Sequence, residues 1–151
     1  MSLIALTLCF ATSVIAEPED RDAIAKQQDN RVKIVLTEPE RAVIFGEMRY
    51  FLIGTQQIIA AIANDNMKKV SEVAETLGPK MMRNIAKKTI RPKLPLGFKK
   101  FGHSLHNNFD MIAQNAKDFG DSQLILKQLG AALEKCVACH AAYQITIEGN
   151  Q

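Results

Sequence analysis

Residues 121–147 read DSQLILKQLGAALEKCVACHAAYQITI. Side chains that favour a buried position recur here at steps of three and four: Leu126, Leu129, Leu133, Cys136, His140, Tyr143 and Ile147. This spacing is typical of one face of an α-helix, and Asp121 is a favourable residue to cap its start. The stretch therefore predicts a C-terminal helix whose inward stripe carries a cysteine and a histidine.

Three stretches upstream show the same helical period. Thr37-Glu38-Pro39-Glu40 has the form of a capping box and predicts a helix that begins there and ends near residue 64. The expected inner stripe of this helix is Ile44, Met48, Phe51, Thr55, Ile58 and Ile62. The residues that flank the stripe, and are also expected to be buried, are Phe45, Leu52 and Ile59. A second helix is expected over residues 66–85, interrupted at Gly78-Pro79, and a third over residues 98–119, ended by Gly120.

Four helices with short connections pack most simply as an antiparallel bundle. The 151 residues suffice for one compact domain, and we assign residues 37–151 to it. Residues 17–36 are polar apart from a short apolar run at 32–36, and we interpret them as an N-terminal arm. The sequence thus predicts an all-α protein, an up-down-up-down four-helix bundle.

Residues 1–16 are uncharged and mostly apolar, and they end in Ser-Val-Ile-Ala before a polar stretch. This pattern predicts a signal peptide cleaved after Ala16, although no basic residue precedes the apolar run. The alternative is an uncleaved anchor, but the run is shorter than the roughly 20 residues that a spanning helix needs. Export to the periplasm of a Gram-negative type of bacterium, with no membrane span after cleavage, is the expected outcome. It removes Cys9 and leaves Cys136 and Cys139 in the mature chain.

Cys136-Val-Ala-Cys139-His140 has the spacing of a c-type haem attachment motif. In such motifs the two thiols add to the haem vinyl groups, and the histidine binds the iron. Two alternatives use the same residues, namely a Cys-x-x-Cys redox pair and a zinc site completed by His103 or His106. A redox pair expects a βαβ context, and both histidines belong to a different predicted helix without a zinc-finger spacing. We therefore expect one covalent haem c.

An exported helical chain that ends in Cys-x-x-Cys-His-x-x-Tyr resembles the class II cytochromes c, the cytochrome c′ family. The resemblance covers residues 38–147, and its specific part is residues 136–143. It implies a four-helix bundle, haem binding by Cys136, Cys139, His140 and Tyr143, and a possible homodimer. The family commonly has Arg or Lys after that tyrosine to hold a haem propionate, whereas this chain has Gln144.

The second axial position of the iron decides what such a protein does. The resemblance implies either a vacant position or a methionine from the first helix, and Met48 on the inner stripe is the candidate; the alternative is a simple core methionine. His103 and His106 stand at a similar height on the third helix, so a bis-histidine site is a further alternative. We interpret them instead as solvated or haem-edge histidines. Arg49 is a candidate partner of a propionate, or an ordinary surface arginine.

The sequence favours a small electron carrier with a periplasmic redox partner. The alternative is a five-coordinate haem protein that binds NO or CO in a distal pocket lined by Ile44, Phe45, Phe51 or Leu52. No paired carboxylates, activated nucleophile or phosphate loop is apparent, so we do not expect an enzyme.

The charges are unevenly distributed along the sequence. The net charge is +3, yet residues 76–109 hold a run of Lys and Arg after Glu75 without one acidic residue. This segment suits docking to an acidic redox partner or an anionic membrane, or it serves solubility alone. Export and the absence of a recognition motif argue against nucleic acid.

Overall fold

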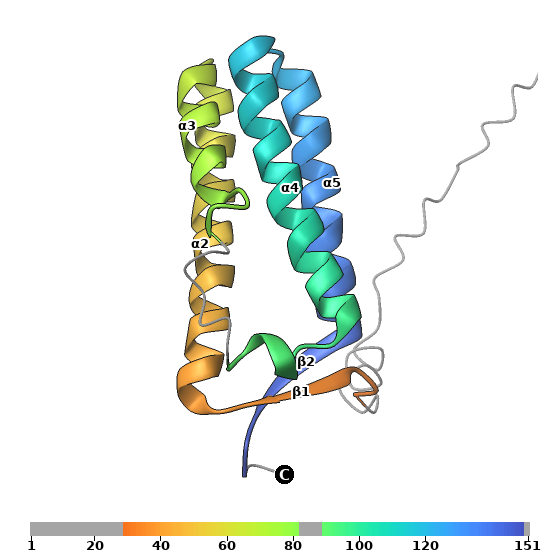
Figure 1. The fold of residues 1–151 in the computed structure, drawn as a ribbon. Helices are drawn as coiled ribbons and strands as arrows, with labels where there is room; N and C mark the ends of the chain where they lie inside the picture. Colours follow the sequence, from red (N-terminus) through yellow and green to blue (C-terminus); the bar gives the residue numbers. More distant parts are fainter. Residues whose placement is uncertain (1–28, 82–88, 150–151) are drawn as a thin grey trace, which may run out of the picture. The chain divides into compact units, whose positions relative to one another are not determined.

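The computed structural model describes residues 29–81 and 89–149, which contain four α-helices, one short 3-10 helix and two strands (Figure 1). The predicted all-α class with four helices is confirmed, with the two short strands as an addition. The elements in chain order are β1 (Val32–Leu36), α2 (Glu38–Ala63), α3 (Met67–Leu77), η2 (Arg91–Lys93), α4 (Leu96–Asp118), α5 (Ser122–Ala142) and β2 (Tyr143–Ile147).

Some predictions fall outside the described residues. These are the signal peptide at 1–16, most of the arm, and the continuation of the second helix beyond residue 81. The chain separates into a unit Met1–Asn30 and a unit Arg31–Gln151, and all the elements belong to the second unit. No helix in the described ranges combines the length and the apolar character that a membrane crossing requires.

The helix ends follow the capping residues of the sequence. Glu40 accepts a hydrogen bond from the backbone N–H of Thr37 at 3.0 Å, which forms the predicted capping box of α2. Asn66 caps α3 by accepting from the N–H three residues later at 2.9 Å, and Asp121 caps α5 in the same way. Gly120 adopts φ 63°, a left-handed conformation that costs glycine little, and so turns the chain tightly between α4 and α5.

The helices pack in the order of the chain. Successive helices run in opposite directions in Figure 1, and α3 packs against α2 and α4, while α4 packs against α5. Within the described residues, α2 and α5 share no comparable contact. The core between the helices includes the buried side chains Phe51, Ile58, Val70, Leu77, Phe109, Ile112, Ile125 and Leu129.

On α2 and α5, some side chains that were predicted to be buried are exposed. On α2, Leu52 and Ile59 are 71% and 48% exposed instead of buried. On α5, Leu126 and Leu133 are 42% and 41% exposed, and the core takes the residue before each of them. The prediction for α5 was wrong because apolar residues occur side by side along this helix, so several stripes fit its period.

A parallel strand pair replaces the predicted end of the last helix. The helix was expected to include Tyr143 and Ile147, but α5 ends at Ala142 and residues 143–147 form β2. β2 pairs with β1, in the register Val32↔Tyr143 to Leu36↔Ile147, so part of the predicted arm is a strand. Both segments are rich in β-branched side chains, which favour strands.

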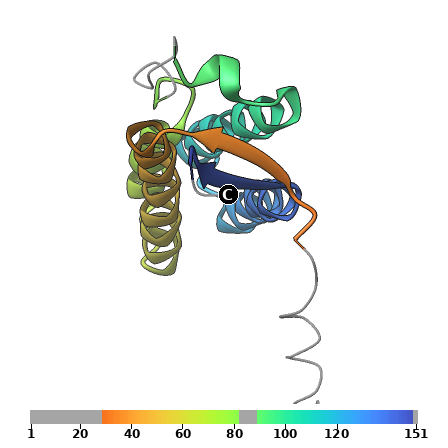
Figure 2. The same ribbon diagram turned by 90° about the horizontal axis from the view of Figure 1, so that it is seen from below.

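The strand pair lies next to the ends of the helices (Figure 2). A second apolar cluster includes residues of this pair. Its buried members come from β1, α2 and the segment before η2: Ile34, Leu36, Ile44 and Ile90. Partly buried side chains pack against it, among them Met48, Phe98 and Tyr143. The cluster therefore fixes the start of α2 and the end of α5 at the same end of the bundle.

Candidate functional site

A cavity of about 390 Å³ lies among α2, α4 and α5, and we name it the central cavity. Its volume is within the range of small-molecule sites, and most of its lining is apolar. The side chains that line it include Met48, Cys136, Cys139 and His140. The structure thus brings the haem attachment motif and the candidate methionine to one cavity.

The motif occupies the last turns of α5. Cys136 and Cys139 are half-buried and are not joined in a disulfide. His140 has an exposed side chain, yet it lines both the central cavity and a neighbouring cavity of about 260 Å³, which we name the end cavity. The motif therefore faces the cavities from a helix end, not from the centre of the core.

Burial disfavours the thiolate form of both cysteines. It raises the pKa of Cys136, whose Sγ donates to the carbonyl of Ala132 at 3.7 Å. The pKa of Cys139 rises to about 11, chiefly through burial and secondly through the neighbouring Cys136. A redox-active Cys-x-x-Cys pair usually has a lowered pKa, because the thiolate is the reactive form. The environment of these cysteines thus disfavours the redox-pair alternative.

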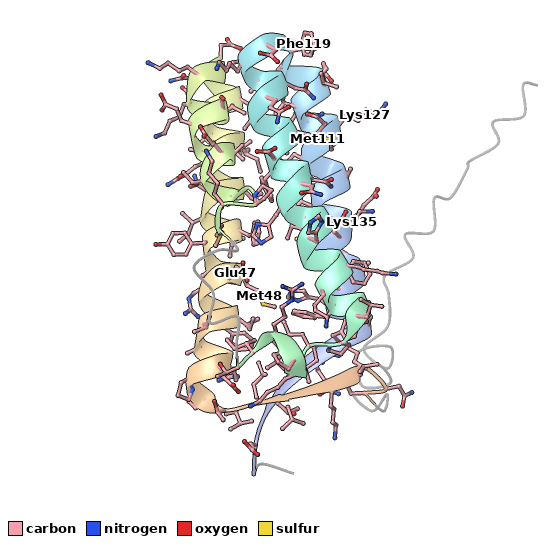
Figure 3. The ribbon with its side chains drawn as sticks, in the orientation of Figure 1. Glu47, Met48, Met111, Phe119, Lys127 and Lys135 are labelled. Atoms are coloured by element: carbon pink, nitrogen blue, oxygen red, sulfur yellow. The ribbon has the colours of Figure 1, made fainter. Side chains whose placement is uncertain are left out.

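The α2 residues of the site come from its first half. Met48 is partly buried and lines the central and end cavities, and Glu47 beside it lines the central cavity (Figure 3). Arg49 is exposed and lies at the edge of the central cavity. The expected proximity of Met48 to the motif across the bundle is therefore present in the structure.

The interpretation of His106 as a solvated histidine is wrong, whereas the haem-edge interpretation stays a prediction, because His106 lines the central cavity. Only 2% of the residue is exposed, and its Nδ1 lies 2.7 Å from the carbonyl oxygen of Leu77, to which it donates. Its Nε2 lies 3.1 Å from Glu47 Oε1, and its ring is 4.9 Å from that of Phe51. Both ring nitrogens are thus engaged in holding α4 against α2 and α3.

His103 remains on the outside of α4, as predicted. It is exposed, its Nδ1 is 3.2 Å from the Asn107 amide nitrogen, and it does not line the central cavity. Within residues 29–81 and 89–149, no three His, Cys, Asp or Glu side chains gather closely enough to form a metal site by themselves. A zinc site completed by His103 or His106 is therefore not assembled.

Protein-family models, curated proteins and solved structures give no match to this chain. The functional conclusion therefore rests on the cavity and its lining. Two features of the site were not visible from the sequence, namely the Glu47–His106 pair at the central cavity and the place of Arg31 at the end cavity. Each depends on contacts between segments far apart in the chain, for which no local pattern exists.

Arg31 approaches the motif because β1 pairs with β2. Its Nη1 donates to the carbonyl of His140 at 3.2 Å, and the Gln144 side-chain amide donates to the Arg31 carbonyl at 3.3 Å. Arg31 also lines the end cavity, together with Tyr143, whose ring packs edge-on against Phe98 at 5.6 Å. A cation thus lies at the C-terminal end of α5, where a helix carries partial negative charge.

We expect Arg31→Ala to destabilise the end of α5. Loss of the hydrogen bond and of the charge at the helix C-terminus should lower the free energy of unfolding by about 1 kcal/mol. The measurement is urea unfolding followed by circular dichroism. Lys33→Ala, exposed on β1 just after Arg31, is the matched control and should lower the free energy of unfolding less. Equal effects of the two substitutions would show that the contact with His140 contributes nothing.

Proposed function

We propose that the chain is an exported c-type cytochrome that carries one covalently bound haem and transfers electrons. The observation that supports this most is the meeting of Cys136, Cys139, His140 and Met48 at one cavity. The spacing of the motif and the signal-like N-terminus are consistent with it. We assign it to the class II cytochromes c on the resemblance of the motif and the four-helix fold.

The lining of the central cavity fits a porphyrin. Leu52 and Leu133 line it and are 71% and 41% exposed, so a large flat apolar group would cover side chains that otherwise face water. The lack of extensive contact between α2 and α5 leaves room for such a group between them. Aromatic side chains, including Phe51, Phe101 and Phe109, form part of the wall.

In this proposal each group of the chain has one role. Cys136 and Cys139 would hold the haem by thioether bonds, and His140 and Met48 would bind its iron. Arg49 at the central cavity and Arg31 at the end cavity offer guanidinium groups to the haem carboxylates, beside the Tyr143 hydroxyl. When bound, the haem iron supplies a one-electron couple. The rigid core of Phe51, Phe109 and their neighbours limits rearrangement during that change.

Electron transfer is favoured over gas binding by the place of Met48. A methionine that lines the same cavity as His140 can occupy the position that a gas would need, and methionine ligation raises the reduction potential. No substrate chemistry is proposed. The expected setting is the periplasm, after cleavage behind Ala16.

A redox titration with carbon monoxide tests this function. The wild-type protein, matured in a host that attaches haem c, should show one reversible one-electron couple. Carbon monoxide should change neither the couple nor the absorption spectrum of the reduced form. A shift caused by the gas would contradict the electron-carrier proposal and favour a gas-binding protein.

A further inference from the structure

A shallow, strongly basic hollow lies on α4 and η2. It measures about 450 Å³ and is lined by Arg91, Leu96, Lys99, Lys100, His103, Ser104 and Asn107. We name it the basic hollow. None of its lining residues is acidic, so its potential is positive over a continuous area.

The cations of the basic hollow are not neutralised by neighbours. Elsewhere on the surface, Lys93 pairs with Glu40 at 2.7 Å and Lys80 with Glu75 at 2.8 Å. In the described part of the chain, Arg91, Lys99 and Lys100 have no ion-pair partner. Their charge is therefore available to a molecule that approaches from outside.

The basic hollow adjoins the central cavity through one intermediate hollow of about 300 Å³. That intermediate hollow shares Arg91, Lys99 and His103 with the basic hollow. On its other side it shares residues with the central cavity, including Phe98 and His106. A partner seated on the basic hollow would thus be separated from the central cavity by this intermediate hollow and the side chains that line it.

We propose that the basic hollow is the docking surface for an acidic face of a redox-partner protein. The inference rests on the proposed function and adds the place and the charge of the partner. The concave shape of the basic hollow can accommodate protruding carboxylate side chains of a protein. The surface of a bilayer is flat and would not fill the hollow. Unpaired charges next to an electron-transfer site speed up association by steering the partner.

The test uses the haem-loaded protein and flavodoxin, an acidic flavoprotein, as the probe. Each reduced flavodoxin donates one electron and is itself oxidised, while the ferric haem becomes ferrous. The second-order rate is measured by stopped flow at low and at high ionic strength. Lys99→Glu/Lys100→Glu should slow the reaction about 10-fold or more at low ionic strength, with the difference largely lost at high ionic strength.

The matched control is Lys69→Glu/Lys127→Glu, which changes the net charge equally at two exposed positions outside the basic hollow. The second-order rate constant of this control variant should stay within about threefold of the wild-type value. Equal slowing by both double variants would overturn the proposal, because net charge alone would then explain the effect. Binding to phosphatidylglycerol vesicles that only the Lys99/Lys100 variant loses, with unchanged flavodoxin rates, would also overturn it and assign the face to a membrane.

Haem loading is confirmed by mass and spectrum before any rate is measured. Absence of haem would refute the proposed function. In a loaded protein, equal rates for the wild type and the Lys99/Lys100 variant would refute the docking surface alone.

Discussion

Met48→Ala is expected to turn a protein that is indifferent to carbon monoxide into one that binds it. Met48 lines the same cavity as His140, and in the proposed cytochrome its removal would leave the iron without a second protein ligand. The absorption spectrum of the ferrous protein should change from low-spin to high-spin. Carbon monoxide should then convert all of the ferrous protein to the carbon monoxide complex. The reduction potential should fall, because the methionine no longer favours the ferrous form. Absorption spectra with and without the gas, together with a redox titration, measure these changes.

Met111→Ala is the control for this experiment. Met111 is 47% exposed on α4 and does not line the central cavity, so its removal should leave spectrum and potential unchanged (Figure 3). If Met48→Ala has the same spectrum as the wild type, Met48 is not a ligand. A wild-type spectrum that already responds to the gas would instead indicate a vacant position behind side chains such as Leu52.

Cys136→Ser/Cys139→Ser should abolish covalent attachment of haem. The two thiols line one cavity one helical turn apart, so each serves one thioether bond. Each single variant should retain one bond, and the double variant none. Haem staining of a denaturing gel measures this, because only covalently held haem stays with the polypeptide.

Cys9→Ser is the control, because Cys9 lies in the predicted signal peptide. This substitution should leave the haem staining of the protein unchanged. The double variant should also unfold at a lower temperature than the wild type, because α2 and α5 would lose the group expected between them. Covalent haem in the double variant would refute attachment through these cysteines.

The helices and their capped ends, apart from the C-terminal end of α5, could be predicted from the sequence because the signals are local. The capping box of Thr37 and Glu40, the cap at Asp121 and the turn at Gly120 all occur where the sequence places them. The buried stripe of α5 was less certain, since adjacent leucine and isoleucine residues fit more than one stripe. The choice between them depends on the neighbouring helices and not on α5 itself.

The strand pair could not be predicted in the same way. β1 and β2 lie at opposite ends of the described chain, and their pairing depends on the bundle between them. Tyr143 and Ile147 continue the helical period of α5, so the period alone favoured a longer helix. The pairing also brings Arg31 to the carbonyl of His140, which explains why this residue was missing from the predicted site.

The structure brings the predicted site residues together where chemistry and spacing coincide. Cys136, Cys139, His140 and Met48 line one cavity, as their positions on two helix faces suggested, and their roles toward a haem stay predictions. The burial of His106 could not be predicted, because it depends on a carbonyl of α3 and a carboxylate of α2. Neither partner has a fixed spacing from it in the sequence.

The intact mass of the matured protein tests the central claim most directly. After expression in a host that attaches haem c, the mass should equal that of residues 17–151 plus one haem, and denaturation should not remove the addition. A mass equal to that of the polypeptide alone, from a host shown to mature another c-type cytochrome, would contradict the proposal that this chain carries a covalent haem.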